Sequence, residues 1–372
     1  MRPQRLLPHR HRSWQASDAL LAFPLGLIAV IVGVDLLTPI GIPLGPLLVV
    51  APAITASFAG AFATAMVAAI AVVGLVAVGV ILDQGLLSTM YFQSQIISLV
   101  VVSVVVTAFR YLRERHTEEL AQVRAVSEAA QRVVLRPLPQ RLGPLRVASV
   151  YLAAQEQAQI GGDLYAATRT ADATRLIVGD VMGKGLTAIS DAALLLCAFR
   201  EAAHRQADLP DLVTYLDHSV CWNLAESSEP EKAGECFITA VVIDIPDASR
   251  RMRMVTCGHP PPLLLRGRQV ITLHPTRPAP PLGLGELADP DYRADTFTFE
   301  PGDLLLLYTD GVVEARSPEG VFYPLAERAA SWVEDETPLA LVHHLRADLL
   351  AHVGGRLADD AAVIAVQRAP DY

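Results

Sequence analysis

A run of 97 residues from Ser13 to Phe109 contains no lysine or arginine. Its only acids are Asp18, Asp35 and Asp83, out of 69 charged residues in a chain of 372. A soluble domain carries charge on about a quarter of its residues, whereas a membrane-crossing helix needs ~20 apolar ones. The other 66 charged residues are spread over 275 positions, an ordinary density for a soluble protein. We therefore expect a membrane segment joined to a soluble part, which excludes both a single soluble globule and a wholly embedded transporter.

Four apolar stretches can be read within this run. Gly41-Ile42-Pro43 and Asp83-Gln84-Gly85 break it, but the division near Gly60 is weakly marked, so the count depends on where the central run is cut. Arginines precede the first stretch and follow the last, and positive residues stay on the cytoplasmic side. The sequence therefore predicts a multi-pass domain in the cell membrane, residues 1–112, with both ends and the soluble part cytoplasmic. The expected spans are about Ala19–Leu36, Ile40–Gly60, Ala61–Leu82 and Met90–Leu112.

A helical connector is expected next, over residues 113–140. The segment from Arg110 to Val134 is rich in Glu, Arg, Ala and Gln, and its apolar residues recur at a loose spacing of three to four. Pro137 and Pro139 then end the helix. This pattern is compatible with a helix that pairs with its copy in a homodimer, and equally with a plain solvated spacer.

The soluble remainder is acidic, because residues 110–372 hold 26 basic and 36 acidic side chains. That balance argues against a nucleic-acid-binding surface, which needs a basic face. Strand-like runs come in consecutive pairs and the helical patterns are grouped, which predicts an α+β domain with antiparallel sheets over residues 141–372. The expected strands are Leu145–Tyr151, Arg175–Val178, Phe237–Ile245, Arg251–Thr256, Val270–Leu273, Asp303–Tyr308 and Ala361–Val366, and the expected helices are Leu186–Gln206, Leu209–Leu224, Leu325–Val333 and Pro338–His352.

Aspartates stand in turns at the ends of the predicted strands, and three of the four sets contain glycine. The sets are Gly161-Gly162-Asp163, Gly179-Asp180, Thr309-Asp310-Gly311 and the pair Asp359-Asp360. Each alone is typical of a turn. Carboxylates grouped without His or Cys partners indicate an all-oxygen site for Mg²⁺ or Mn²⁺. Such sites commonly hold two ions that activate a water molecule for attack on phosphorus.

Two other motifs carry less weight. A P-loop has four residues between its first glycine and its Gly-Lys pair, and the lysine is followed by serine or threonine. Here three residues separate Gly179 from Gly183, and Gly185 and then Leu186 follow Lys184, so the motif is not a P-loop. His259 stands in a proline-rich loop, where a ligand or general acid is one interpretation and a structural histidine the favoured one.

Eight short motifs follow one another in order between Gln131 and Val366. They are Val134–Pro139, Ile160–Tyr165, Val178–Gly185, Phe237–Thr239, Gly258–Pro262, Pro281–Gly283, Tyr308–Ala315 and Asp359-Asp360. This series resembles the metal-dependent PP2C-type protein serine/threonine phosphatases, specifically the bacterial sporulation and stress-regulator branch (SpoIIE/RsbU-like).

The resemblance implies a four-layer αββα sandwich of antiparallel sheets, preceded here by the all-α membrane domain. It implies a hydrolase that removes phosphate from serine or threonine of a regulatory protein, by analogy an anti-sigma-factor antagonist. A catalytically silent receptor or partner-binding module of the same fold is the alternative, and such a module should have lost core acids that this chain retains.

The resemblance also assigns roles to individual residues. Two ions, Mn²⁺ or Mg²⁺, would be bridged by Asp180, with the Val181 carbonyl as a further ligand. Asp310 would hold one ion and Asp359 the other, which makes Asp180, Asp310 and Asp359 the catalytic acids. Asp360 is the less favoured partner in its pair. The remaining predicted ligand, direct or through water, is Asp163.

Overall fold

The computed structural model describes residues 14–37, 44–81, 89–154, 161–226, 237–285, 291–332 and 337–369. The chain divides into two compact units, Met1–Ala121 and Gln122–Tyr372.

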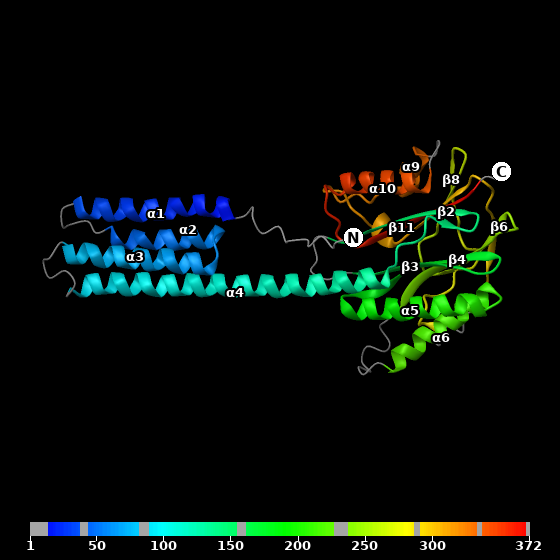
Figure 1. Ribbon diagram of the computed structural model, residues 1–372, viewed down its shortest axis with the longest axis horizontal. Coiled ribbons are helices and arrows are strands. Elements are labelled where there is room, and N and C mark those ends of the chain that lie inside the picture. The colour runs from blue at the N-terminus through cyan, green and yellow to red at the C-terminus, as the bar shows by residue number, and fades with distance from the viewer. Residues whose placement is uncertain are drawn as a thin grey trace, which may run out of the picture. The chain divides into compact units, whose positions relative to one another are not determined.

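The first unit consists of apolar helices packed side by side (Figure 1). Within the part of the chain that the structure describes, three are long and apolar enough to cross a membrane, over Leu20–Leu37, Ala61–Ile81 and Met90–Glu119. The predicted second span is a shorter apolar helix, Gly45–Phe58, which has a proline in its first turn and ends in extended backbone at Ala59. The elements are α1 (Trp14–Leu37), η1 (Gly45–Val49), α2 (Val50–Phe58), α3 (Ala61–Ile81) and α4 (Met90–Val134), the last of which ends within the second unit.

Two polar side chains of α4 bind the junction between α2 and α3. The Arg110 Nε donates a 2.9 Å hydrogen bond to the carbonyl oxygen of Ala59, and Glu114 accepts a 3.1 Å bond from the amide of Ala61. Carbonyls at the end of one helix and amides at the start of the next lack partners within their own helices, so the two bonds satisfy both termini. The α2–α3 junction therefore lies beside the arginine-bearing part of α4.

The second unit contains two antiparallel sheets. One has the strand order β1-β2-β11-β10-β7-β8 and the other β3-β4-β5-β6-β9. The strands are β1 (Arg141–Leu142), β2 (Leu145–Leu152), β3 (Gly161–Arg169), β4 (Ala173–Lys184), β5 (Ile238–Pro246), β6 (Arg251–Cys257), β7 (Leu263–Arg266), β8 (Gln269–Thr272), β9 (Asp295–Thr298), β10 (Leu304–Tyr308) and β11 (Ala361–Arg368), and the helices are α5 (Leu186–Arg205), α6 (Leu209–Glu226), α8 (Asp310–Val313), α9 (Leu325–Ala330) and α10 (Pro338–His352).

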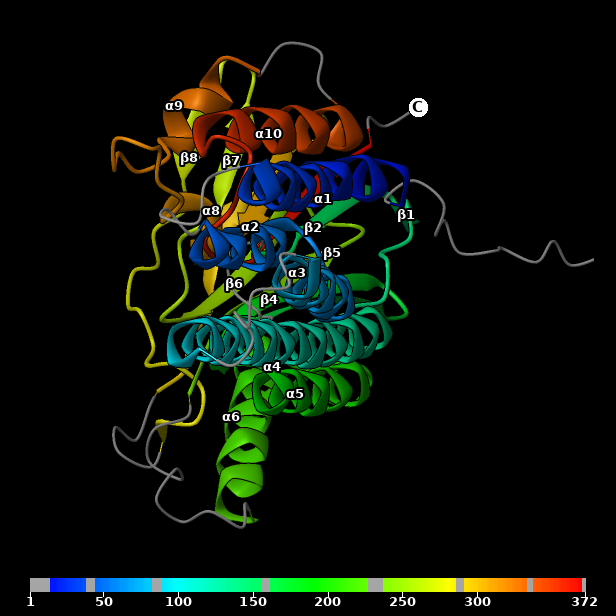
Figure 2. The same cartoon turned by 90° about the vertical axis from the view of Figure 1, so that its left-hand side faces the viewer.

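Helices cover the outer face of each sheet, which confirms the expected four-layer αββα arrangement. α5 packs on β3 and β4 with α6 beside it, and α10 packs on β2 and β11. Figures 1 and 2 show α5 and α6 on one side of the strands and α10 on the other.

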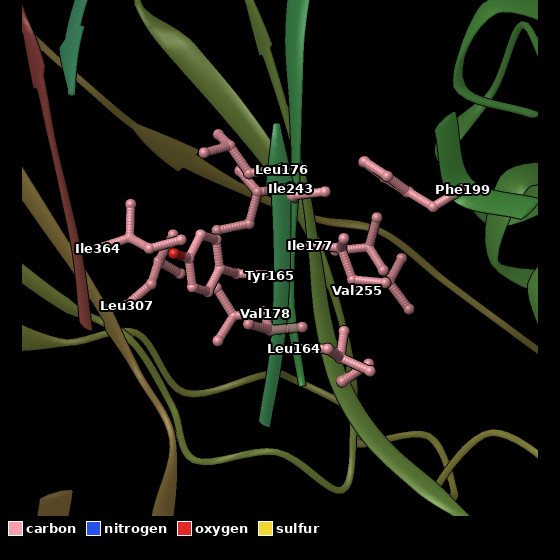
Figure 3. Packing of buried hydrophobic residues seen from close by; sticks show 14 of the residues in the cluster. Leu164, Tyr165, Leu176, Ile177, Val178, Phe199, Ile243, Val255, Leu307 and Ile364 are labelled. Carbon is pink, nitrogen blue, oxygen red and sulfur yellow. The ribbon is translucent and has the colours of Figure 1, made fainter. Parts of the chain in front are cut away.

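The alternating side chains of each strand divide the core into layers. In β10, Leu305 and Leu307 belong to the cluster between the sheets, whereas Leu304 and Leu306 belong to the cluster under α10. Figure 3 shows Tyr165 pointing toward Leu307, while Ile177 lies on the side of Phe199 from α5. A strand buried on both faces must be apolar throughout, which explains the run of leucines in β10.

The predicted strands and helices are all present, but several boundaries and connections differ. The Gly161-Gly162-Asp163 segment, expected as a turn, lies in β3, and Asp180 lies within β4 rather than in the turn after it. β1, β3, β7 and β9 were not expected, and in β3 the glycines and alanines have low strand propensity. Its pairing with β4 supplies the missing stability.

Candidate metal centre

Two aspartates face each other across neighbouring strands. Asp163 of β3 and Asp180 of β4 are paired in the strand register. Side chains of residues directly opposite in an antiparallel pair project from the same face, with Cβ atoms roughly 5 Å apart. Asp163 is buried, with 4% of its surface exposed. Two carboxylates so placed repel each other unless a proton or a cation lies between them.

A third carboxylate comes from the other sheet. α8 begins at Asp310, directly beyond the end of β10. Asp163, Asp180 and Asp310 each present a carboxylate oxygen, and these three atoms lie within 4.8 Å of one another. The Thr309 hydroxyl donates a 2.7 Å hydrogen bond to Asp163 and accepts one of 2.9 Å from the amide of Ala362. The centre therefore lies where the ends of the two sheets meet.

Asp360 is held by donors within the protein. Its carboxylate accepts 2.6 Å hydrogen bonds from the amides of Ala154 and Gly161, and a third bond from the hydroxyl of Tyr151. The side chain of Gln131, near the end of α4, donates to the Tyr151 oxygen. These bonds tie the start of β3 to the start of β11, so Asp360 positions the segments that carry its neighbours.

Asp359 has a different partner. Its two carboxylate oxygens lie 3.2 and 3.1 Å from the Nζ of Lys184, the last residue of β4. A cavity of about 300 Å³ opens here, and all five predicted aspartates and Lys184 line it. The structure thus brings the predicted carboxylates to one cavity. Three form a tight cluster, Asp359 faces the lysine, and Asp360 faces the donors described above.

The predicted carbonyl ligand, Val181, follows Asp180 in β4 and its side chain is buried. A Cβ added at Gly162 would lie 2.4 Å from the Val181 carbonyl oxygen. Glycine at this position therefore allows β3 to approach the β4 backbone closely. The assignment of Val181 and of the individual carboxylates as metal ligands stays a prediction.

The crowding of acids changes their affinity for protons. Burial, followed by the charges of Asp310, Asp359 and Asp360, raises the pKa of Asp180 to about 7, against a smaller opposing effect of Lys184. Burial and then Asp180 raise the pKa of Asp163 well above its usual value.

Such carboxylates retain protons until a cation replaces them, so binding of a divalent ion would release protons. The donors of the cluster are carboxylate oxygens, which fit the hard cations Mg²⁺ and Mn²⁺.

His259 is a structural residue, as favoured from its sequence. Its ring is 5% exposed, with Nε2 3.0 Å from the carbonyl oxygen of Tyr308 and Nδ1 3.2 Å from the hydroxyl of Thr239. Burial lowers its pKa to about 4. The neutral ring therefore links β10 to β5 beside the centre.

The residues that hold the carboxylates in place were not predicted from the sequence. Thr309 stands next to Asp310 in the chain, and a hydroxyl side chain beside a predicted ligand was the one feature that could have marked it as a hydrogen-bond donor to the site. Tyr151 is 209 residues from Asp360, and Lys184 is 175 residues from Asp359. Neither pairing can be predicted from residue spacing, because the partners are distant in the sequence and come together only when the sheets form.

Known proteins identify the unit that carries this centre. The sequence model described as Stage II sporulation protein E (SpoIIE) matches residues 170–369, more than half of the chain. The chain belongs to the SpoIIE family. This confirms the resemblance carried by the ordered motifs, and Asp180, Asp310 and Asp359 lie inside the matched range.

Two curated relatives share part of their sequence with this SpoIIE-family chain. Phosphoserine phosphatase RsbP of Bacillus subtilis (strain 168) is 29% identical over 198 residues, which are 51% of this chain and 45% of RsbP. Protein IcfG of Synechocystis sp. is 30% identical over 132 residues, which are 34% of this chain and 20% of IcfG. The chain thus spans less than half the length of these relatives.

Solved structures establish the fold of the SpoIIE-family unit. The RsbU and RsbW domains of Rv1364c from Mycobacterium tuberculosis are 27% identical, with a TM-score of 0.50 over 61% of each chain. The SiaA-PP2C domain of Pseudomonas aeruginosa is 19% identical, with a TM-score of 0.54 over 69% of this chain and 98% of that one. The second likeness shows the fold alone, and that fold is PP2C, as the sequence predicted.

Proposed function

We propose that this protein is a membrane-anchored, metal-dependent phosphatase that hydrolyses phosphoserine or phosphothreonine on a regulatory protein. The observation that carries the proposal is the cluster of Asp163, Asp180 and Asp310, whose carboxylate oxygens lie within 4.8 Å of one another at the edge of a cavity. Three carboxylates held this close repel one another, which favours a bound cation between them. Membership of the SpoIIE family and the phosphoserine phosphatase RsbP among its relatives support the reaction class.

Some residues of the site would bind the cations, and others hold these ligands in place. Asp180 would bridge two Mn²⁺ or Mg²⁺ ions, Asp310 and Asp359 would each hold one, and the Val181 carbonyl and Asp163 would complete the set. When bound, the ions supply an acidified water as nucleophile and neutralise charge on the phosphoryl group. Thr309 and Asp360 keep the carboxylates in place through their hydrogen bonds. Inorganic phosphate and a free hydroxyl side chain are the products.

The substrate is a phosphorylated regulatory protein, by analogy an anti-sigma-factor antagonist. Two observations support a protein substrate in such a pathway. RsbP is named a phosphoserine phosphatase, and Rv1364c carries RsbU and RsbW domains in one chain.

The first unit anchors the enzyme in the cell membrane, with the catalytic unit in the cytoplasm. Three of its helices have the length and apolar composition of membrane spans. Arginines stand at both ends of this unit in the sequence, and Arg110 binds the α2–α3 junction. Because positive residues stay inside, that junction and both chain ends lie on the cytoplasmic side.

Removal of divalent cations should abolish the activity. In inside-out membrane vesicles holding the full chain, we expect Mn²⁺-dependent phosphate release from an external phosphoserine peptide without detergent. A chelator should lower the rate at least about a hundredfold, since the metal supplies several kcal/mol of transition-state stabilisation. Added Mn²⁺ should restore it.

Right-side-out vesicles are the matched control, and their activity should appear only after detergent treatment. Phosphate release that persists in the chelator would refute the metal mechanism. If no phosphate is released under any of these conditions, the silent receptor becomes the better interpretation. Equal activity in both kinds of vesicle would refute the orientation.

The connector, residues 113–140 in the sequence prediction, pairs with its copy in a homodimer. Leu112, Val126 and Val133 of α4 are spaced by 14 and 7 residues, so they lie on one face of the helix, and Glu119 occupies the position between the first two. Their exposed fractions are 63%, 57% and 75%. Exposed apolar residues at this repeat form a stripe, interrupted at Glu119, that favours pairing of two helices over a solvated spacer.

Charge placed on this stripe should weaken the dimer. We expect the full chain in mild detergent to be dimeric, and Val126→Glu to raise its dissociation constant at least about tenfold, because a charge would be buried in the seam. Ala125→Glu, which adds the same charge off the stripe, should leave the dimer intact. Light scattering across a dilution series measures both. A wild-type monomer, or equal effects of the two variants, would contradict the proposal.

A further inference from the structure

We propose that Lys184 binds the phosphoryl group of the substrate, and that Asp359 holds its ammonium group until a cation takes that carboxylate. This inference rests on the proposed phosphatase function and assigns a residue to the recognition of its substrate. It gives the ion pair between Lys184 and Asp359 a role in the reaction cycle.

The Lys184 side chain lines the cavity of the acid cluster and is partly exposed to solvent. Lys184 ends β4, its Nζ is 3.1 Å from one carboxylate oxygen of Asp359, and both side chains line the cavity of the acid cluster. The side chains of Lys184 and Asp359 are 32% and 53% exposed, so a molecule arriving from solvent can reach both. Among the described residues that line this cavity, Lys184 is the one with a cationic side chain.

The charge of the cavity favours a cation beyond the two proposed metal ions. Five carboxylates line it, and together they exceed the charge of two divalent ions. A phosphoserine brings a further charge of about −1.5 to −2. Without an ammonium group beside the metals, the substrate would enter a cavity with an excess of negative charge, and repulsion would weaken its binding.

The choice of lysine fits this task. The chain holds two lysines, Lys184 and Lys232, against 28 arginines. An ammonium group is a compact charge with three rotatable donors on a flexible stem, whereas a guanidinium is a rigid fork suited to one fixed partner. Lysine can therefore exchange a carboxylate for a phosphate without a change of backbone.

The surroundings of Lys184 leave room for its side chain to move. Gly183 and Gly185 adopt φ values of +108° and +89°, a region that favours glycine, and no atom lies within 4 Å of a Cβ built at either position. The space on either side of Lys184 is therefore open, while its backbone stays paired with Gly161 of β3. The side chain can leave Asp359 and turn toward a phosphate in the same cavity.

The proposal predicts opposite effects on two ligands. Lys184 competes with a cation for Asp359, so Lys184→Gln should bind Mn²⁺ at least as tightly as the wild type. The same variant loses a charged hydrogen bond to phosphate, so its affinity for phosphate should fall about tenfold or more. General damage to the site would instead weaken both ligands.

Calorimetry on the full chain in detergent tests both effects. Mn²⁺ is titrated into the metal-free protein, and inorganic phosphate is then titrated into the Mn²⁺-loaded protein. We expect Lys184→Gln to show the opposite changes described above, with the KM for a phosphoserine peptide raised in step with the phosphate dissociation constant. Lys184→Arg should recover part of the phosphate affinity. Arg251→Gln, at the exposed start of β6, is the matched control and should change neither ligand.

An unchanged phosphate affinity in Lys184→Gln would overturn the proposal, and so would a loss of Mn²⁺ binding equal to the loss of phosphate binding. The result is separable from the test of the function itself. If the wild type released no phosphate from the peptide, the proposed function would fail, and the phosphate titration would still decide the role of Lys184.

Discussion

Replacement of Asp180 by asparagine is expected to lower Mn²⁺-dependent phosphate release by about a thousandfold, because the carboxylate proposed to bridge the two ions is lost and several kcal/mol of transition-state stabilisation go with it. The folded protein should survive the change. Asparagine has the same shape, and it removes one of the charges that burial and the neighbouring acids destabilise. The metal-free variant should therefore melt at the same temperature as the wild type or above it, while Mn²⁺ no longer raises its melting temperature.

A loss of turnover together with an unchanged or higher melting temperature of the metal-free variant distinguishes a metal ligand from an acid that stabilises the fold. Asp172→Asn is the matched control, since Asp172 is exposed in the turn at the other end of the β3–β4 hairpin. It should leave turnover, metal binding and melting unchanged. Wild-type turnover in Asp180→Asn would remove the metal mechanism. A lower melting temperature of the metal-free variant would show that Asp180 serves the fold instead.

The sequence was informative where one physical requirement dominates. The run without lysine or arginine set the first unit apart, because a helix long and apolar enough to cross a membrane tolerates few charges. β10 was predicted because a strand buried on both faces must be apolar, and its end located Asp310. The ordered motifs then led to the family, which the match over residues 170–369 confirms.

Sequence reasoning was weaker where pairing between distant segments decides the outcome. β3 forms from residues of low strand propensity because β4 lies beside it. The difference between Asp359 and Asp360 has the same origin. They are neighbours in the chain, yet one binds Lys184 and the other binds Tyr151 and two amides. Only the folded sheets determine which partner each receives.

The close approach of two site-bearing segments gives the second large prediction. A Cβ added at Gly311 would lie 1.8 Å from the carbonyl oxygen of Asp360. A backbone oxygen cannot move aside by changing a rotamer, and two hydrogen bonds between Thr309 and Ala362 hold the segments together here. Gly311→Ala must therefore separate the start of α8 from the start of β11. Overpacking of this kind costs about 3 kcal/mol, or a melting temperature lower by about 6–12 °C in a unit of this size.

The same separation should weaken Mn²⁺ binding at least about tenfold, because Asp310 and Asp359 stand on the two segments that move apart.

Gly302→Ala provides the matched control at the other end of β10. Gly302 has a φ of +92° and open space around its Cα, so alanine there costs only backbone strain, about 1–2 kcal/mol. Gly302→Ala should lower the melting temperature by about 2–8 °C and leave the Mn²⁺ affinity unchanged. Thermal melting and Mn²⁺ calorimetry on the full chain measure both quantities. Equal Mn²⁺ affinities in the two variants would mean that the contact at Gly311 does not set the spacing of the carboxylates.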